Sequence, residues 1–183
     1  MTVQQTILEL NKVSVDVKTF FGNLSKEQLN WKPAENKWSI AQCLHHLIVA
    51  NKSYYPQFDA IISETRKNSF YQNMKFIARL FGKQMIHDLG PKKPRTFKNP
   101  KILTPSHSGI PLSIITDFLL HNEELKIYFG KLEGKDLENT IIYSPVSKIV
   151  IYNLKDVIEM LAGHEQRHLI QAQNVLNHPK FPK

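Results

Sequence analysis

The segment L154-K-D-V-I-E-M-L-A-G-H164-E-Q-R-H168-L-I-Q-A-Q-N-V-L-N177 has a pronounced helical pattern. Steps of three and four residues separate the positions of one seam: Leu154, Val157, Leu161, His164, His168, Gln171 and Val175. This spacing is typical of a helix that packs one stripe along other helices. It predicts a helix over residues 154–177, capped by Asn153, in a helical bundle. The three polar seam positions need a separate explanation.

Two more helices are expected in the first third of the chain. The first covers residues 5–21, with Leu8, Val15 and Phe20 among its apolar positions. The second begins after Ser39, because a serine followed three residues later by glutamine forms a capping box. Its apolar residues keep helical spacing to about residue 66, and Pro56 should kink it.

The middle of the chain combines helical and irregular segments. A helical segment is expected over residues 70–85, and Pro111 fits the first turn of another long helix. The stripe of that helix has a 4-3-4-3-4 spacing: Ile114, Phe118, His121, Leu125, Tyr128 and Leu132. Residues 90–111 contain five prolines and should form a long basic crossover loop. Residues 141–152 are rich in β-formers but are expected to be too isolated to make a sheet.

Composition bounds the class of protein. The chain has 183 residues, of which 42% are hydrophobic and 22% charged, which predicts one domain over residues 1–183. The helical segments described above make its expected class all-α. The lone Cys43 excludes an internal disulfide and indicates a reducing compartment. No secretory leader and no membrane-spanning stretch is recognisable. A cytoplasmic location is therefore expected.

The formal net charge of +8 raises the question of nucleic-acid binding. Part of the excess is local, because five cations lie in the proline-rich loop: Lys92, Lys93, Arg95, Lys98 and Lys101. Only one aromatic residue, Phe97, is interleaved among them, and no recognition motif is present. The sequence thus favours no specific nucleic-acid partner.

His164 and His168 are one helical turn apart on the same face, which places two imidazoles close enough to share one metal ion. The alternative is a pair of core histidines satisfied by Gln171, by Glu165 or by water. A metal site would need a third ligand from a neighbouring helix. His45 and His46 are both candidates, and helical periodicity does not choose between them.

Two motifs resemble those of the DinB/YfiT-like superfamily. W38-S-I-A-Q-C-L-H-H46-L is similar to its first metal motif and H164-E-Q-R-H168-L-I-Q171 to its second, and the ending H178-P-K-F-P is also common in related sequences. The resemblance extends from the first helix through N99-P-K-I-L-T-P105 to the end. It implies a four-helix bundle, commonly a homodimer, with a three-histidine metal site that opens into a cavity.

The resemblance also assigns residues. It selects His46 over His45, so that the expected ligands are His46, His164 and His168. His121 and Gln171 would line the cavity or contact the ligands. Three further histidines, in or near loops, are expected to be ordinary solvated side chains: His87, His107 and His178.

Three neutral imidazoles leave a divalent ion with at least one open position, which is typical of catalytic sites. The expected metal is zinc or nickel, with iron or manganese as alternatives. Such an ion can activate a thiol or a water molecule. The superfamily resemblance covers thiol S-transferases and metal-dependent hydrolases; the absence of an evident general base favours transfer of a low-molecular-weight thiol to an electrophilic substrate. A non-catalytic metal-binding or interaction protein is the third possibility.

Anion binding is expected beside this centre. Four cations could hold a carboxylate of the thiol or substrate: Lys92, Lys93, Arg95 and Arg167. Cys43 precedes His46 by about one turn, but buried cysteine usually acts as a small hydrophobe. No catalytic role is therefore assigned to it.

Overall fold

A computed structural model describes residues 1–66, 74–91 and 109–183. These residues are mainly helical, with one small sheet. The elements in chain order are α1 (Val3–Phe21), α2 (Lys26–Asn30), α3 (Ile40–Lys52), α4 (Tyr55–Ile62), α5 (Lys75–Leu89), α6 (Ile114–Leu132), β1 (Ile141–Ser144), β2 (Ser147–Asn153) and α7 (Leu154–Leu176).

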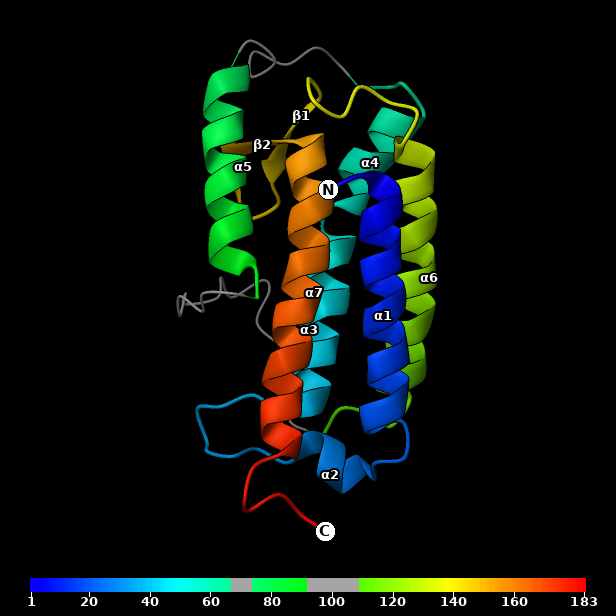
Figure 1. Ribbon diagram of the computed structural model, residues 1–183, viewed down its shortest axis with the longest axis vertical. Coiled ribbons are helices and arrows are strands. Elements are labelled where there is room, and N and C mark those ends of the chain that lie inside the picture. Colours follow the sequence, from blue (N-terminus) through cyan, green and yellow to red (C-terminus); the bar gives the residue numbers. More distant parts are fainter. Residues whose placement is uncertain (67–73, 92–108) are drawn as a thin grey trace.

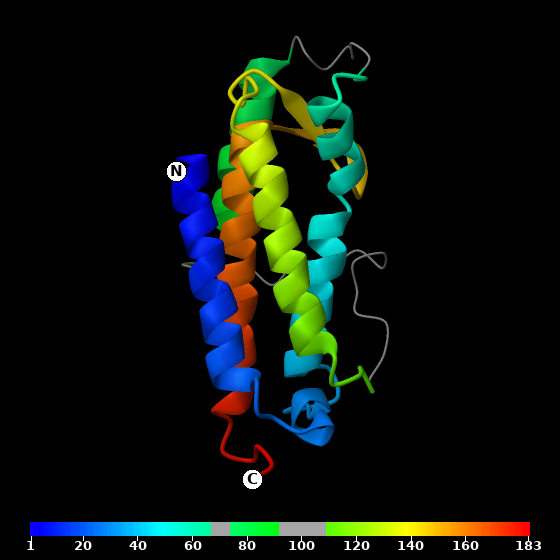
Figure 2. The ribbon, with the colours of Figure 1, turned by 90° about the vertical axis from the view of Figure 1, so that its right-hand side faces the viewer.

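The long helices α1, α3, α6 and α7 pack side by side, and α5 lies along the outside of α7 (Figure 1). The short helix α2 and the C-terminal segment lie at one end of the bundle. At the other end, α4 lies above α3, and the β1–β2 hairpin lies beside the upper parts of α5 and α7 (Figure 2). Within the described ranges, none of the helices combines the length and the apolar character needed to cross a bilayer.

Capping boxes begin three of the helices. The box of Ser39 and Gln42 at the start of α3 is the one predicted from the sequence. Ser25 and Gln28 form the same box at α2, a helix that the sequence analysis missed. Asn153 occupies the cap position of α7 as predicted, but its side chain makes no capping hydrogen bond.

The long second helix is interrupted earlier than predicted. α3 ends at Lys52 and α4 begins at Tyr55, so the break precedes Pro56, which lies in the first turn of α4. A proline ring clashes with the carbonyl group four residues before it, here that of Lys52. A regular helix through this point is therefore disfavoured, and here Pro56 lies in the first turn of a new helix. Similarly, α6 begins at Ile114, after Pro111 and not at it.

The predicted apolar face of α1 was wrong. Leu8, Val15 and Phe20 are 59%, 63% and 42% exposed. The buried positions of α1 are Val3, Thr6, Leu10, Val13, Val17 and Phe21. The helix carries two apolar stripes, and the one with regular steps of three and four residues faces the bundle.

The expectation that residues 141–152 form no sheet was also wrong. β1 and β2 form a two-stranded antiparallel hairpin in which Ile142 pairs with Tyr152. An isolated hairpin is marginal in water, but packing against a helix stabilises it. Here Ile141 and Ile151 pack with Ala78 of α5 in a small third core cluster. The helix predicted over residues 70–85 is observed as α5, which extends to Leu89; residues 70–73 lie outside the described ranges.

The main core consists of two apolar clusters, one toward each end of the bundle. On α6 the first cluster begins at Leu125 and the second ends at Phe118. Between these positions the helices bury polar side chains, among them His46, His121, Asn122, Glu165 and His168. The bundle thus has a polar layer at mid-height, which apolar packing alone does not explain.

Candidate metal centre

Three histidines from two antiparallel helices meet in this polar layer. His46 comes from α3, and His164 and His168 come from successive turns of α7. Nε2 of His164 lies 3.3 Å from Nε2 of His46 and 3.0 Å from Nε2 of His168. All three residues are buried, with exposed fractions of 2%, 8% and 6%. Among the described residues, they form the one cluster of this kind with metal-ligand character.

The spacing of the nitrogen atoms fits a metal ion. Tetrahedral coordination with metal–nitrogen bonds near 2.0–2.1 Å separates two ligand nitrogens by about 3.3 Å. Hydrogen bonds among the rings cannot satisfy all three Nε2 atoms, since one neutral imidazole donates through only one ring nitrogen. A cation at the centre would accept all three lone pairs. The donor set therefore fits a divalent metal ion that accepts imidazole ligands.

The surroundings keep these imidazoles neutral and ready to coordinate. Burial lowers the pKa of His164 well below its ordinary value, and the charges of His168, His46 and Arg167 lower it further. Burial likewise lowers the pKa of His168 to about 3. Only neutral imidazole offers a lone pair to a metal, so protons compete weakly for these two ligands at neutral pH.

Trp38 forms an aromatic wall of the centre. Its ring stacks on His168 with a centroid separation of 5.5 Å and an interplanar angle of 17°, and lies 4.9 Å from the ring of His46. The capping box of Ser39 sets the start of α3 and so holds the adjacent Trp38 beside the histidines. From the sequence alone, Trp38 is only the first residue of the motif that contains His46, and no contact with the other two histidines was predicted for it.

Arg167 and Gln171, both predicted near the site, lie on α7 beside the ligands. Nη1 of Arg167 donates a hydrogen bond to the carbonyl oxygen of Asp88, 2.6 Å away at the end of α5. This bond ties the arginine to the outer helix. The Gln171 side chain is close enough to raise the pKa of His168, against the larger lowering by burial. Nδ1 of His168 is buried, and in the described part of the chain no hydrogen-bond partner lies at bonding geometry to it.

His121 lies in the same polar layer but in a different cluster. Its Nε2 is 3.1 Å from Nδ2 of Asn51, which also donates to Oε1 of Glu165 at 2.8 Å. Its Nδ1 is 3.2 Å from the hydroxyl group of Tyr55. Since Nδ2 of Asn51 can only donate, Nε2 of His121 accepts and its Nδ1 carries the proton. Burial lowers the pKa of His121 to about 4, so the ring is neutral.

Glu165 is fully buried although it follows a metal-ligand candidate directly. Burial raises the pKa of Glu165 to about 8, and hydrogen bonds from Asn122 and Asn51 oppose this rise. Asn122 itself donates to the hydroxyl group of Ser14 at 3.0 Å. Three oxygen atoms of the cluster have no hydrogen-bond partner among the described residues: Oε2 of Glu165 and Oδ1 of Asn51 and Asn122.

No role was predicted for Asn51 or Asn122 from the sequence. A signal for Asn51 existed, because it follows Leu47 by four residues and precedes Tyr55 by four, inside the apolar stripe of α3 and α4.

The remaining candidates lie elsewhere. His45 is half-buried, with a buried Nδ1 that has no partner among the described residues, and His178 packs on Trp31 with ring centroids 5.3 Å apart. Cys43 is buried, and burial raises the pKa of its thiol. Lys92, Lys93, Arg95 and His107 lie outside the described residues.

The sequence matches the profile of the DinB superfamily over residues 9–172. The chain belongs to the DinB superfamily. The match includes all three histidines of the centre. The chain is also 25% identical over 171 residues to the uncharacterized protein YuaE of Bacillus subtilis (strain 168), covering 90% of this chain and 93% of that relative. No solved structure matches the chain significantly.

Proposed function

We propose that this DinB-superfamily protein binds one divalent metal ion through Nε2 of His46, His164 and His168 and uses it to activate a small nucleophile. The main support is that three buried Nε2 atoms converge. Nε2 of His164 lies 3.3 Å from that of His46 and 3.0 Å from that of His168. Zinc and nickel suit this donor set. We also infer that α1, α3, α6 and α7 form the four-helix bundle implied by the superfamily.

The residues around the centre define its part in such chemistry. A divalent ion held by three imidazoles lowers the pKa of a coordinated thiol or water molecule. His46, His164 and His168 fix the position of this chemistry, and the buried layer around them limits the access of bulk water. Trp38 offers an aromatic surface beside two of the ligands. An apolar part of a substrate would pack against that surface.

The nucleophile we favour is a low-molecular-weight thiol. A hydrolase needs a general base near the activated water, and Glu165 is the carboxylate nearest in sequence to His164. Its Oε1 is bonded to Asn51, and its raised pKa of about 8 favours the protonated acid at neutral pH. A thiol needs no such base once its pKa is lowered. The reaction would be transfer of the thiol to an electrophilic acceptor.

The test follows consumption of a panel of thiols, including bacillithiol and glutathione, in the presence of a generic electrophile. Metal-loaded protein should consume thiol faster than chelator-treated protein. The His164→Ala variant should lose this activity, because it lacks the central nitrogen of the cluster. His45→Ala is the matched control, since it removes a neighbouring imidazole from the same helix.

Two other results would redirect the proposal. Cleavage of esters or amides without thiol consumption would favour a metal-dependent hydrolase. Metal binding without either reaction would favour a non-catalytic role. A triple substitution of Lys92, Lys93 and Arg95 in the active protein should raise KM for the thiol more than it lowers kcat, if these cations bind its carboxylates.

A further inference from the structure

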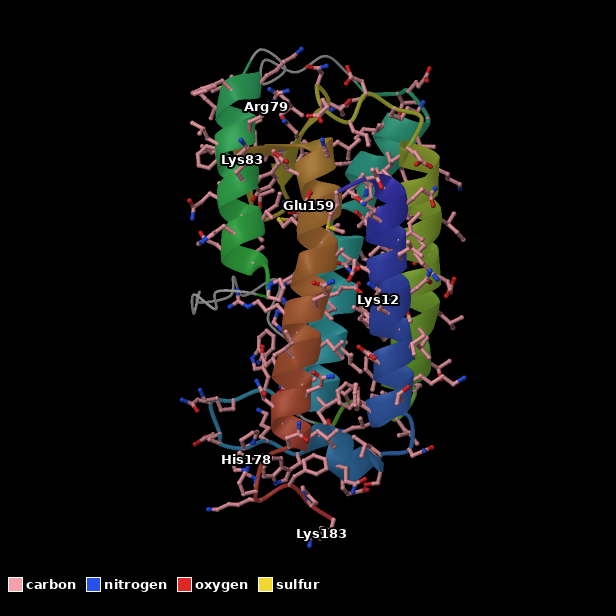
Figure 3. The ribbon with its side chains drawn as sticks, viewed as in Figure 1. Lys12, Arg79, Lys83, Glu159, His178 and Lys183 are labelled. Atoms are coloured by element: carbon pink, nitrogen blue, oxygen red, sulfur yellow. The ribbon has the colours of Figure 1, made fainter. Side chains whose placement is uncertain are left out.

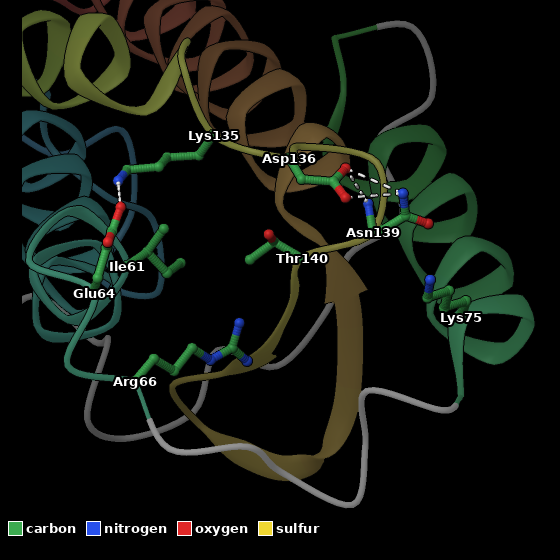
Figure 4. Close-up of a pocket in the computed structure, with 8 residues that line it drawn as sticks. All are labelled: Ile61, Glu64, Arg66, Lys75, Lys135, Asp136, Asn139 and Thr140. Atoms are coloured by element: carbon green, nitrogen blue, oxygen red, sulfur yellow. Dashed lines mark hydrogen bonds and ion pairs between the residues drawn. The ribbon is translucent and has the colours of Figure 1, made fainter.

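A cavity of about 480 Å³ lies between the end of α4, the start of α5 and the connection from α6 to β1 (Figure 4). Its volume falls in the range of small-molecule sites. The lining shares no residue with the three-histidine centre. The cavity is therefore a candidate for a second binding site, independent of the metal.

The strongest feature of this cavity is the half-buried guanidinium group of Arg66. In Figure 4 it points into the space below Thr140. Its Nη2 donates a hydrogen bond to the carbonyl oxygen of Ile141, which is its hydrogen-bond partner among residues 1–66, 74–91 and 109–183. Burial lowers the pKa of Arg66, which reflects the cost of removing this charge from water. A guanidinium has five N–H donors, so most of them remain available.

The other charges of the lining leave a positive excess. Nζ of Lys135 pairs with Oε1 of Glu64 at 2.7 Å, so these two charges cancel. The Asp136 carboxylate accepts from the backbone and side chain of Asn139 at 3.0–3.1 Å, and Figure 4 shows it turned toward that residue. Lys75 lines the same cavity from α5, and in the described part of the chain it pairs with no carboxylate. Two cations thus face one remaining anion.

We propose that this cavity binds a small molecule through an oxyanion, either a phosphate or a carboxylate group. The planar fork of Arg66 matches two oxygens of such a group. Lys75 supplies a second positive charge at a different side of the cavity. Thr140, whose side chain points into the space in Figure 4, would donate its hydroxyl hydrogen to the same group. Ile61 supplies an apolar contact for the rest of the ligand.

The test is isothermal titration of the full chain with inorganic phosphate and, separately, with citrate, at constant ionic strength with chloride as the reference anion. At least one of the two anions should bind saturably with one site per chain. Saturation by phosphate alone identifies phosphate as the recognised group, and saturation by citrate alone identifies carboxylate. Arg66→Gln should weaken this binding about tenfold or more, since hydrogen bonds to a charged group are lost.

A matched control separates local contacts from net charge. Lys12→Gln makes the same change of charge on the outer face of α1, away from the cavity (Figure 3), and should leave anion binding unchanged. A second control separates this cavity from the metal, because anions also coordinate metal ions. His164→Ala should bind the anion as tightly as the unmodified chain.

Three results would overturn the proposal: no saturable binding of either anion, equal binding by the Arg66→Gln chain, or loss of binding in the His164→Ala chain. Helical circular dichroism checks that Arg66→Gln is folded. If Arg66→Gln is not folded, the Lys75→Gln and Thr140→Val variants test the site instead. Unchanged anion affinity in both would contradict the proposal.

Discussion

Two buried histidine clusters lie in the polar layer of the bundle, and they differ in the partners of their ring nitrogens. His121 has a protein partner at each ring nitrogen, Asn51 at Nε2 and Tyr55 at Nδ1. His164 instead faces the Nε2 atoms of two other imidazoles. Burial lowers the pKa of both histidines, so neither burial nor pKa separates them.

The difference shows what marks a ligand histidine in a helical core. Both ring nitrogens of His121 have hydrogen-bond partners within the protein. In the three-histidine cluster, Nε2 atoms face one another. An unsatisfied buried polar atom costs about 1–3 kcal/mol, and a cation among the three histidines would remove this cost by accepting their lone pairs. The arrangement of partners, and not the apolar environment, distinguishes the two roles.

The largest effect expected from this contrast is on metal content. The ion should be lost from each of three variants: His46→Ala, His164→Ala and His168→Ala. Their metal affinity should fall by more than about 100-fold, the upper end for residues that only support a ligand. His121→Ala and His45→Ala should keep about one ion per chain. Elemental analysis of the purified variants measures this. Full metal retention in the His164→Ala protein would falsify the centre.

The second effect concerns Glu165 and stability against pH. The raised pKa of Glu165 means that the unfolded chain releases this proton near pH 4.5, whereas the folded chain keeps it to about pH 8. Between these values rising pH favours unfolding, by up to about 1.4 kcal/mol per pH unit for this group. Glu165→Gln should therefore gain stability relative to the unmodified chain as pH rises from 4.5 to 8.

Urea unfolding of both proteins at several pH values measures this difference. The lowered pKa values of His164 and His168 affect the free energy of unfolding below about pH 6.5. There rising pH favours the folded state, because the unfolded chain binds more protons. These effects are common to both proteins and cancel in the comparison. A constant stability difference across this range would contradict the buried, protonated state of Glu165.

The third effect is optical. Trp38 stacks on His168, whereas Trp31 packs on His178 near the C-terminal end. Addition of metal to chelator-treated protein should change tryptophan fluorescence by a modest fraction, because Trp38 lies against two ligand rings. Trp38→Phe should bind metal and lose this change, and Trp31→Phe should retain it. The same change in both variants would place the reporter elsewhere.

The smallest expected effect is on the fold itself. Removal of metal by a chelator should leave helical circular dichroism nearly unchanged at room temperature, because the apolar clusters at both ends of the bundle are complete without the centre. The His121 cluster needs no ion and should hold the middle. A large loss of helical signal would make the centre structural.

The sequence predicted an element correctly where a local pattern, such as a capping box or a helical stripe, agrees with the face that packs in the bundle. The Ser39–Gln42 box predicted the start of α3, and steps of three and four residues predicted α6 and α7. α1 shows the limit of this reasoning. Leu10 and Leu8 both belong to apolar stripes, and only contact with α6 and α7 decides which is buried. The hairpin could not be predicted because it packs on α5 and on the main apolar cluster, and no local pattern encodes these contacts.

The site was predicted to a similar degree. The one-turn spacing of His164 and His168 indicated a shared ion, but the choice of His46 over His45 came from the superfamily resemblance. The structure brings His46 to the other two. The burial of Glu165 with Asn51 depends on contacts between α3 and α7, which no local pattern encodes. The thiol, its acceptor and a homodimer stay predictions.

The sequence separation of the ligands sets the order of events during synthesis. His46 and His164 are 118 positions apart. At about 5–20 residues per second, a ribosome adds His164 roughly 6–24 s after His46. Through that interval the growing chain carries one ligand histidine without its partners, so the ion cannot guide early folding. If the three histidines bind metal as proposed, the complete site forms only in chains in which α7 has docked on α3, and metal occupancy would report that this late docking step has taken place.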